Sequence, residues 1–163
     1  MKNENLRIEE VIRPGTTNLC LTGIRNKEEI IDYLAGLLDK VGLLNDKQKY
    51  IGAVHERELM GPTYMEHFIA IPHGKSDAVR EAGIAFGRSE DGILYETCLG
   101  GGIAKMIFLL AIPNRMSGDA YMAVLARLAR LLVHEEFRNE LMSAVNYDDV
   151  VKSIRNGENL LEE

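Results

Sequence analysis

The chain has 163 residues, of which 46% are hydrophobic and 27% charged, and it carries a formal net charge of −6. This composition is typical of one soluble globular domain, and an acidic chain without a basic cluster argues against a nucleic-acid partner. No apolar stretch reaches the roughly 18 residues that a membrane span needs. No hydrophobic segment follows the first five residues, as a secretory signal would require, so we expect a cytoplasmic protein. Cys20 and Cys98 have no motif spacing, so we expect both to be reduced residues of the core.

The first half of the chain shows one early strand, two helices and a second strand. Asn26 can cap the first helix, because its side chain can accept a hydrogen bond from the first turn. Gly42 can end that helix, whose apolar residues recur with a 3.6-residue period. The predicted elements are a polar start over 1–16, a strand over 18–21, a helix over 27–41, a helix from 45 or 46 to about 58, and a strand over 68–71.

The second half continues the alternation of strands and helices. Residues 106–112 are the most apolar run of the chain, which is typical of a central buried strand. The long helix after it is expected to face the core through Met122, Leu125, Leu128, Leu131 and Leu132. The predicted elements are a strand over 83–86, a glycine turn over 100–102, the strand over 106–112, and helices over 119–134, 135–144 and 147–156. Alternating strands and helices predict an α/β layer structure.

The most informative segment is Ile69–Gly74, an apolar run that ends in proline, histidine and glycine. Pro72 has no N–H group to give to a neighbouring strand, so it is expected to end the ladder. Gly74 allows a sharp turn or a close approach of a bulky group. These residues predict that His73 lies at the C-terminal mouth of a strand, where open α/β sheets keep their sites. A neutral imidazole there can serve as nucleophile, base or metal ligand.

Two residues upstream of His73 are candidates for the same site. Arg57, at the end of the second helix, can neutralise a phosphate, and Thr63 can donate a hydroxyl hydrogen bond. The alternative interpretation is a solvated pair, Arg57 and Glu58, at a helix end, followed by an ordinary turn threonine. The residues alone leave both interpretations open.

Several short motifs fail on their spacing. Gly74–Ser76 resembles the end of a phosphate-binding P-loop, but Ile69 stands where that loop needs a glycine. His55 and His134 each begin like the zinc-protease helix motif, and neither is followed by the second histidine. We therefore expect neither a P-loop nor a zinc-protease site.

His67 and His73 are six residues apart, so a continuous strand would place both on one face. Such a pair suggests a metal-binding or small-ligand protein as one further hypothesis. No third ligand is evident in the sequence, and two histidines rarely suffice to hold a metal ion. We therefore expect no metal and no cofactor.

The chain resembles the enzyme IIA domains of the bacterial phosphotransferase system, in the fructose–mannitol branch that also holds the nitrogen-regulatory IIA proteins. The resemblance covers about residues 8–157 of what we expect to be a single domain over 1–163. It implies an α/β fold with a mostly parallel mixed sheet sandwiched between helices. The segments that carry it are Arg57-Glu58, Gly61–Thr63, Ile69–Gly74, Ile107–Pro113, the leucines 125, 128 and 132, Glu135–Arg138 and Leu141.

The resemblance implies a phosphoryl carrier. His73 matches the family's histidine, which accepts a phosphoryl group from the phosphocarrier protein HPr and passes it to a cysteine of a IIB domain. The IIB domain then phosphorylates the sugar that a IIC membrane component takes up. Arg57 matches the family's arginine and is expected to neutralise phosphoryl charge. The alternative is a regulatory IIA-like protein that binds partners according to its phosphorylation state.

The chain departs from the family pattern at one position. Many members carry a second histidine at the start of the helix after the central strand, and the matching position here is Tyr121. A tyrosine hydroxyl can bond a phosphate oxygen, although it brings no positive charge. We therefore expect Tyr121 to face His73 across an anion pocket.

Overall fold

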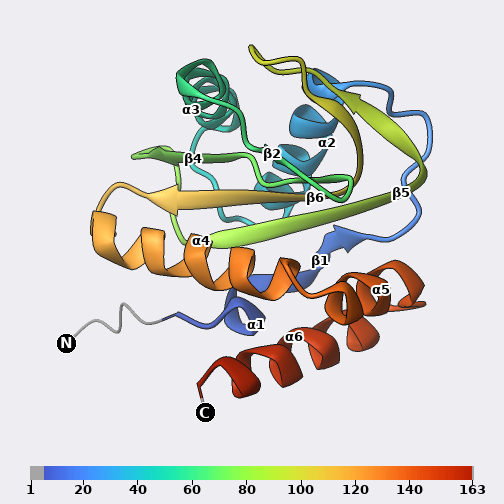
Figure 1. The fold of residues 1–163 in the computed structure, drawn as a ribbon. Helices are drawn as coiled ribbons and strands as arrows, with labels where there is room; N and C mark the ends of the chain where they lie inside the picture. The colour runs from blue at the N-terminus through green and yellow to red at the C-terminus, as the bar shows by residue number, and fades with distance from the viewer. Residues whose placement is uncertain (1–5, 163) are drawn as a thin grey trace.

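The computed structural model describes residues 6–162, which fold into one sheet with helices on both faces (Figure 1). The helices are α1 (Ile8–Val11), α2 (Lys27–Lys40), α3 (Lys47–Met60), α4 (Gly118–Leu132), α5 (Glu135–Ser143) and α6 (Tyr147–Leu161). The strands are β1 (Ile12–Asn18), β2 (Tyr64–Met65), β3 (Ile69–Ala70), β4 (His73–Ser76), β5 (Gly83–Tyr95) and β6 (Gly102–Pro113). None of the helices in this part of the chain is both long and apolar enough to cross a membrane.

The sheet is built around β6, which contacts three other strands. Its order over the described residues is β1-β5-β6-β3-β2, and β4 pairs with β6 beyond the end of β3. The β1–β5, β3–β6 and β4–β6 pairings are parallel, whereas the long β5–β6 ladder and the short β2–β3 pair are antiparallel. The predicted α/β fold with a mixed sheet between helices is confirmed, with the qualification that its longest ladder is antiparallel.

The two faces of the sheet bury separate apolar clusters. Helices α2 and α3 cover one face, and α1, α4, α5 and α6 cover the other (Figure 1). Helix α2 shows why the pattern folds this way: most of its periodic apolar residues are buried, and the Asn26 side chain accepts a hydrogen bond from the Glu29 N–H at 2.9 Å, as predicted. Burial of both faces explains why β6 is apolar nearly throughout.

Three expectations about local structure are wrong. The first strand is Ile12–Asn18, not 18–21, because residues in the presumed polar start pair in parallel with β5. Cys20 and Cys98 are free but exposed rather than part of the core. Met122 is exposed because α4 turns Ala120 and Val124 toward the sheet instead.

The end of α6 also lies beyond its predicted limit at residue 156. Gly157 does not stop the helix. A β-carbon at this glycine would lie 2.6 Å from Leu131 Cδ2, so the missing side chain lets α6 approach α4 closely. The glycine therefore serves helix packing here and not helix termination.

Pro72 interrupts the sheet without ending it, which corrects the predicted place of His73. The carbonyl of Pro72 still accepts a hydrogen bond from the Leu110 N–H at 3.0 Å. The chain then re-enters the sheet as β4, with His73 directly opposite Leu110. His73 is thus the first residue of a strand at the sheet edge and not the residue after a strand. A proline lacks the donor but keeps the acceptor, so a parallel ladder can resume after it.

Candidate functional site

His73 lies between α3 and α4, at the point where β4 begins. Gly74 faces α3, since a β-carbon there would lie 2.9 Å from Val54 Cγ2 and 3.1 Å from the Val54 backbone nitrogen. Side chains alternate along a strand, so His73 and Lys75 face the opposite side, toward α4. The predicted role of Gly74 in close approach is confirmed, and the group that approaches is helix α3.

The His73 ring is held in one orientation by the backbone. Only 6% of the residue is exposed, and its Nδ1 lies 3.1 Å from the carbonyl oxygen of Ile71. A carbonyl oxygen can only accept, so this contact requires the proton on Nδ1 and leaves the Nε2 lone pair free in the neutral ring. Burial lowers the pKa of His73 below its ordinary value, and the positive charge of Arg57 lowers it further. The hydrogen bond to Ile71 and the carboxyl group of Glu58 oppose this shift. The ring is therefore neutral near pH 7 and has a nucleophilic nitrogen.

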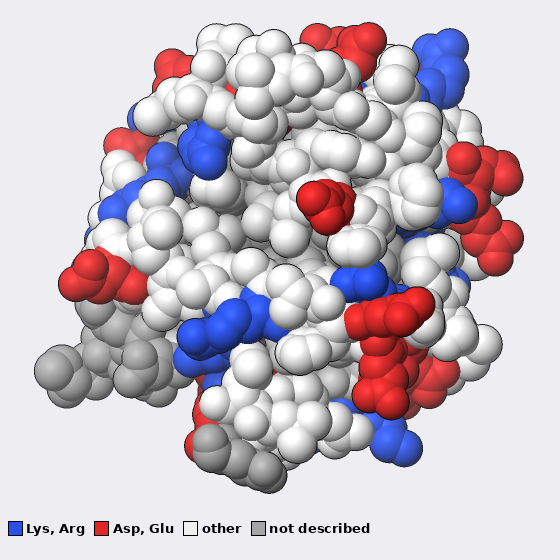
Figure 2. All heavy atoms as spheres, in the orientation of Figure 1, with Lys and Arg blue, Asp and Glu red and all other residues white. Residues whose placement is uncertain are grey.

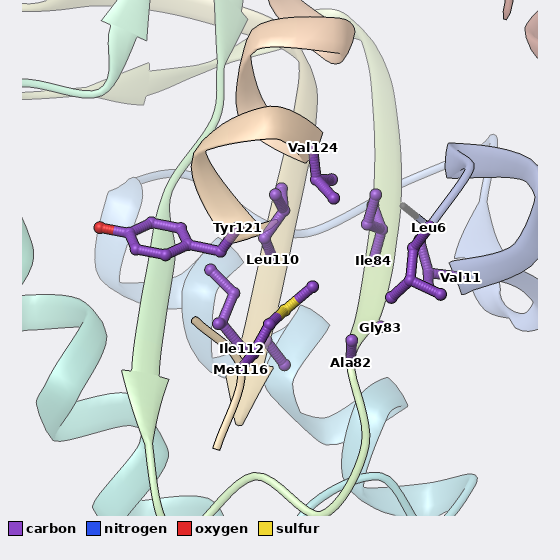
Figure 3. A pocket seen from close by; sticks show the side chains of 11 residues that line it. Leu6, Val11, Ala82, Gly83, Ile84, Leu110, Ile112, Met116, Tyr121 and Val124 are labelled. Atoms are coloured by element: carbon purple, nitrogen blue, oxygen red, sulfur yellow. The ribbon is translucent and has the colours of Figure 1, made fainter. Parts of the chain in front are cut away.

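Tyr121 lies beside His73, as the sequence predicted. It is in the first turn of α4, and the centroid of its ring is 6.3 Å from that of His73. Tyr121 also borders a small apolar crevice between α4 and the sheet, but its hydroxyl points away from the other side chains there (Figure 3). The Nζ of Lys75 lies 5.4 Å from the centre of the Tyr121 ring. Lys75 thus brings to this position a positive charge that the tyrosine lacks.

Arg57 approaches the site from the C-terminal end of α3. Its Nη1 donates a hydrogen bond to the carbonyl of Gly61 at 2.9 Å, which anchors the half-buried guanidinium at the helix end. Its charge contributes to the lowered pKa of His73, so the two groups are electrostatically coupled. Figure 2 shows Lys and Arg side chains gathered over β4 and close to α3, on a face whose centre is otherwise mostly uncharged.

Thr63 and Glu58 are both buried, so the interpretation of a solvated helix end is wrong for these residues. The Thr63 hydroxyl donates its one proton to Glu58 Oε2, and the Tyr95 hydroxyl lies 3.1 Å from the same Thr63 oxygen. In this arrangement Thr63 has no second proton for a phosphate. A signal for Glu58 was present in the sequence: it lies one helical turn after Val54, on the face that also buries Tyr50.

The second oxygen of Glu58 has a different environment. Glu58 Oε1 is buried and forms no hydrogen bond with any described residue, although the Nζ of Lys27 lies 3.7 Å away. The same lysine nitrogen is 5.6 Å from the centre of the Tyr95 ring. Burial, together with the charge of Glu58, raises the pKa of Tyr95, which keeps its hydroxyl protonated and able to donate. Lys27 and Tyr95 are partners of Glu58 that the sequence patterns did not indicate.

His67 does not join His73 in a metal site. It lies in the turn between β2 and β3 with a φ of 67°, so the two histidines are not on one continuous strand. The His67 side chain is half-exposed and its Nε2 is 3.9 Å from Glu66. Within residues 6–162, no three His, Cys, Asp or Glu side chains are grouped to hold a metal ion.

Sequence comparison identifies relatives along nearly the whole chain. The family model for the phosphoenolpyruvate-dependent sugar phosphotransferase system, EIIA 2, matches residues 10–157. The fructose-specific EIIABC component of Bacillus subtilis is 37% identical over 91% of this chain. The chain spans only 23% of that relative's length, and 24% of a mannosylglycerate-specific EIIABC component of Escherichia coli. A mannitol-specific enzyme IIA component of Bacillus subtilis is 33% identical over 78% of this chain and 85% of its own.

The fold is shared with solved structures. The nitrogen regulatory protein IIA-Ntr of Neisseria meningitidis matches with a TM-score of 0.79 and 24% identity, over 90% of this chain and 98% of its own. The mannitol IIA of Escherichia coli, solved in complex with phosphorylated IIB, matches with a TM-score of 0.72 and 23% identity, over 90% and 99% of the two chains. With the family match over residues 10–157, these findings show that the chain belongs to the EIIA 2 family of the phosphoenolpyruvate-dependent sugar phosphotransferase system.

Proposed function

We propose that this protein carries a phosphoryl group on Nε2 of His73 as part of sugar uptake. The observation that carries the proposal is the contact between Nδ1 of His73 and the Ile71 carbonyl at 3.1 Å. It assigns the proton to Nδ1, and burial keeps the imidazole neutral, so Nε2 is the nitrogen available for attack. Family membership supplies the class of reaction, phosphoryl transfer.

The chemistry consists of two displacements at phosphorus. In the first, the Nε2 lone pair of His73 forms a bond to phosphorus while the bond from phosphorus to the donor atom of phospho-HPr breaks. In the second, a cysteine thiolate of a IIB domain attacks the phosphorus, and the bond to Nε2 breaks. The Nδ1 proton stays in place throughout, and neither step involves oxidation or reduction. Such transfers depend mainly on alignment and charge neutralisation.

In this proposal two cations and one hydroxyl assist the transfer. Arg57 supplies a guanidinium anchored at the helix end on the α3 side of His73, and Lys75 supplies an ammonium group on the α4 side. The Tyr121 hydroxyl supplies a neutral donor near the ring. Thr63 donates no hydrogen bond to the phosphoryl group in this proposal, because its hydroxyl proton is already bonded to Glu58.

The relatives support the proposed acceptor. The fructose-specific relative of Bacillus subtilis is an EIIABC component, and the mannitol IIA of Escherichia coli forms a complex with phosphorylated IIB. We therefore propose an HPr-type donor, a IIB acceptor and, indirectly, a IIC transporter, with the protein acting in the cytoplasm. A regulatory role would use the same phosphorylated histidine, but the partner would bind according to the phosphorylation state and would not accept the phosphoryl group.

The test is phosphoryl labelling of the purified chain with enzyme I, HPr and labelled phosphoenolpyruvate. We expect acid-labile label on the native chain, loss of the label in His73→Ala, and full label in His134→Ala, which removes an exposed histidine. Circular dichroism checks that both variants fold. Undiminished label in folded His73→Ala would disprove the proposal. A chase with a IIB protein separates the two roles: transport predicts that the label leaves His73, and a purely regulatory role predicts that it stays.

A further inference from the structure

A continuous chain of hydrogen bonds joins the buried carboxyl group of Glu58 to the ring of His73. The Thr63 hydroxyl donates to Glu58 Oε2. The Ile71 N–H donates to the carbonyl of Thr63 at 2.9 Å, and Nδ1–H of His73 donates to the carbonyl of Ile71 at 3.1 Å. Thr63 takes part through its hydroxyl and its carbonyl, and Ile71 through its N–H and its carbonyl. The ring of His73 is thus connected to Glu58 through two intermediate residues.

The chain passes through the break between β3 and β4, where Pro72 interrupts the edge of the sheet. Ile71 and Pro72 lie between β3 and β4 and belong to neither strand. The Ile71 N–H is therefore bound by Thr63 and not by the β6 ladder. The N–H and the carbonyl of Ile71 belong to successive peptide groups that share its Cα, so a displaced Thr63 would move Ile71 and with it the carbonyl that selects the protonated nitrogen of His73.

The Thr63 side chain is in turn fixed by Glu58 and Tyr95. Because the threonine proton goes to Glu58, the Tyr95 hydroxyl is the donor in its 3.1 Å contact with Thr63. Burying a carboxyl group costs free energy unless its oxygens are bonded, and here Oε1 of Glu58 has no hydrogen-bond partner among the described residues. An apolar side chain at position 58 would fill the same space without that cost. The carboxyl group is therefore better explained by the position in which it holds the Thr63 side chain than by a contribution to stability.

We infer that Glu58 is a positioning residue, which acts through Thr63 and Ile71 to hold His73 with Nδ1 protonated and Nε2 free. The inference about the ring stands on geometry alone. Its consequence for phosphoryl transfer rests on the proposed function.

The first measurement reads the ring directly and needs no phosphoryl donor. The ring nitrogen chemical shifts of His73, measured by ¹⁵N NMR near pH 8, report which nitrogen carries the proton. We expect the Nδ1–H form to predominate in the native chain and in Glu56→Gln, which changes an exposed glutamate of the same helix. We expect Glu58→Gln to give a mixture of both forms and faster hydrogen exchange of the Ile71 amide.

A second variant, Thr63→Val, tests the same link in case Glu58→Gln does not fold. Thr63→Val keeps the shape of the side chain and its backbone carbonyl but removes the hydroxyl link, so it should shift the ring nitrogens in the same direction. A purely structural role for Glu58 predicts lower thermal stability with unchanged ring nitrogens. Folded Glu58→Gln and Thr63→Val chains that keep the native Nδ1–H form would overturn the inference.

Transfer kinetics give the functional consequence. We expect Glu58→Gln to lower kcat about 10- to 100-fold, the order expected when a reacting group is misplaced, with little change in KM for phospho-HPr. A change confined to KM would assign Glu58 to partner docking and refute positioning. If the native chain takes no label at all, the proposed function fails, while the ring measurement still decides the role of Glu58.

Discussion

Glu58 and Glu158 are both buried, but their carboxyl groups are held in opposite ways. Glu158 is 0% exposed, and its two oxygens accept hydrogen bonds from the backbone N–H groups of Ile8 at 2.7 Å and Glu9 at 3.2 Å. Arginines lie 3.9 Å (Arg7) and 3.8 Å (Arg127) from it. Glu58 has a hydrogen bond on one oxygen and none from the described residues on the other.

The difference matches the place of each residue in the molecule. Glu158 joins α6 to the first turn of α1, on the face of the sheet away from α3 (Figure 1). Glu58 lies on α3, which packs beside the strand that begins with His73. A buried carboxyl group with both oxygens bonded is a satisfied structural contact, and its removal leaves its buried donors unpaired. One that is only half bonded, beside a reactive residue, indicates a functional constraint.

The largest expected effect is on stability, at Glu158. Replacing it by alanine leaves two backbone N–H groups of α1 without their acceptor and removes the negative charge beside Arg7 and Arg127. We expect Glu158→Ala to lower the free energy of unfolding by about 3–5 kcal/mol, the range for breaking a buried ion pair. Urea denaturation measures this loss. Glu162→Ala, which removes an exposed partner of Arg7, is the matched control and should cost much less. If Glu158→Ala and Glu162→Ala lost equal free energy of unfolding, Glu158 would not be the structural carboxyl group with which Glu58 is compared.

A smaller effect is expected when the cation beside Glu58 is removed. Lys27→Met keeps the length of the side chain but leaves the buried carboxyl group without the ammonium 3.7 Å from Oε1. We expect a loss of about 1–3 kcal/mol in the free energy of unfolding, the cost of an uncompensated buried polar group. The ring nitrogens of His73 should not change, because the chain of hydrogen bonds runs through Oε2. Lys47→Met is the control, because Lys47 is the first residue of α3 as Lys27 is the first residue of α2. This variant should leave the free energy of unfolding nearly unchanged.

The smallest effect concerns pH and His73. Burial lowers the folded-state pKa of His73 below 6.5, so the unfolded chain binds the proton more readily. The contribution of this histidine to stability is therefore complete above about pH 6.5 and is lost as the pH falls through the folded-state pKa. Its slope cannot exceed about 1.4 kcal/mol per pH unit for one proton. Denaturation of native and His73→Gln chains between pH 5 and 8 measures this contribution. The free energy of unfolding of the native chain should fall relative to that of His73→Gln as the pH is lowered. A difference between the two chains that stays constant with pH would contradict the assigned shift.

Much of the fold could be predicted because its signals are local. The cap at Asn26, the apolar period of α2 and the apolar run of β6 each depend on neighbouring residues, and the structure confirms all three. The first strand was missed because β1 has few apolar residues and depends on its pairing with β5. The exposure of Cys20 and Cys98 also follows from the fold, since burial is decided by what packs above a residue.

Part of the candidate site could also be predicted, because some of its residues belong to a short local motif. His73, Arg57 and Tyr121 are recognisable from motif and resemblance, and the structure brings Tyr121 beside His73 while Arg57 acts on its pKa. The burial of Glu58 followed from the helical period after Val54, yet the charged residue type pointed to solvent. Lys75 was read as part of a failed P-loop, and its place beside the Tyr121 ring depends on the alternation of side chains along β4.

The sequence by itself determined the α/β class, the family and the residue expected to react, because these depend on local periodicity and on a short motif. Only the tertiary structure decided how that residue is held. Pro72 keeps its carbonyl for Leu110, so the chain re-enters the sheet at His73, and Thr63 and Ile71 connect the ring to a buried carboxyl group. Such bonds join residues from separate turns and strands. Their geometry follows from packing, which no spacing along the chain records.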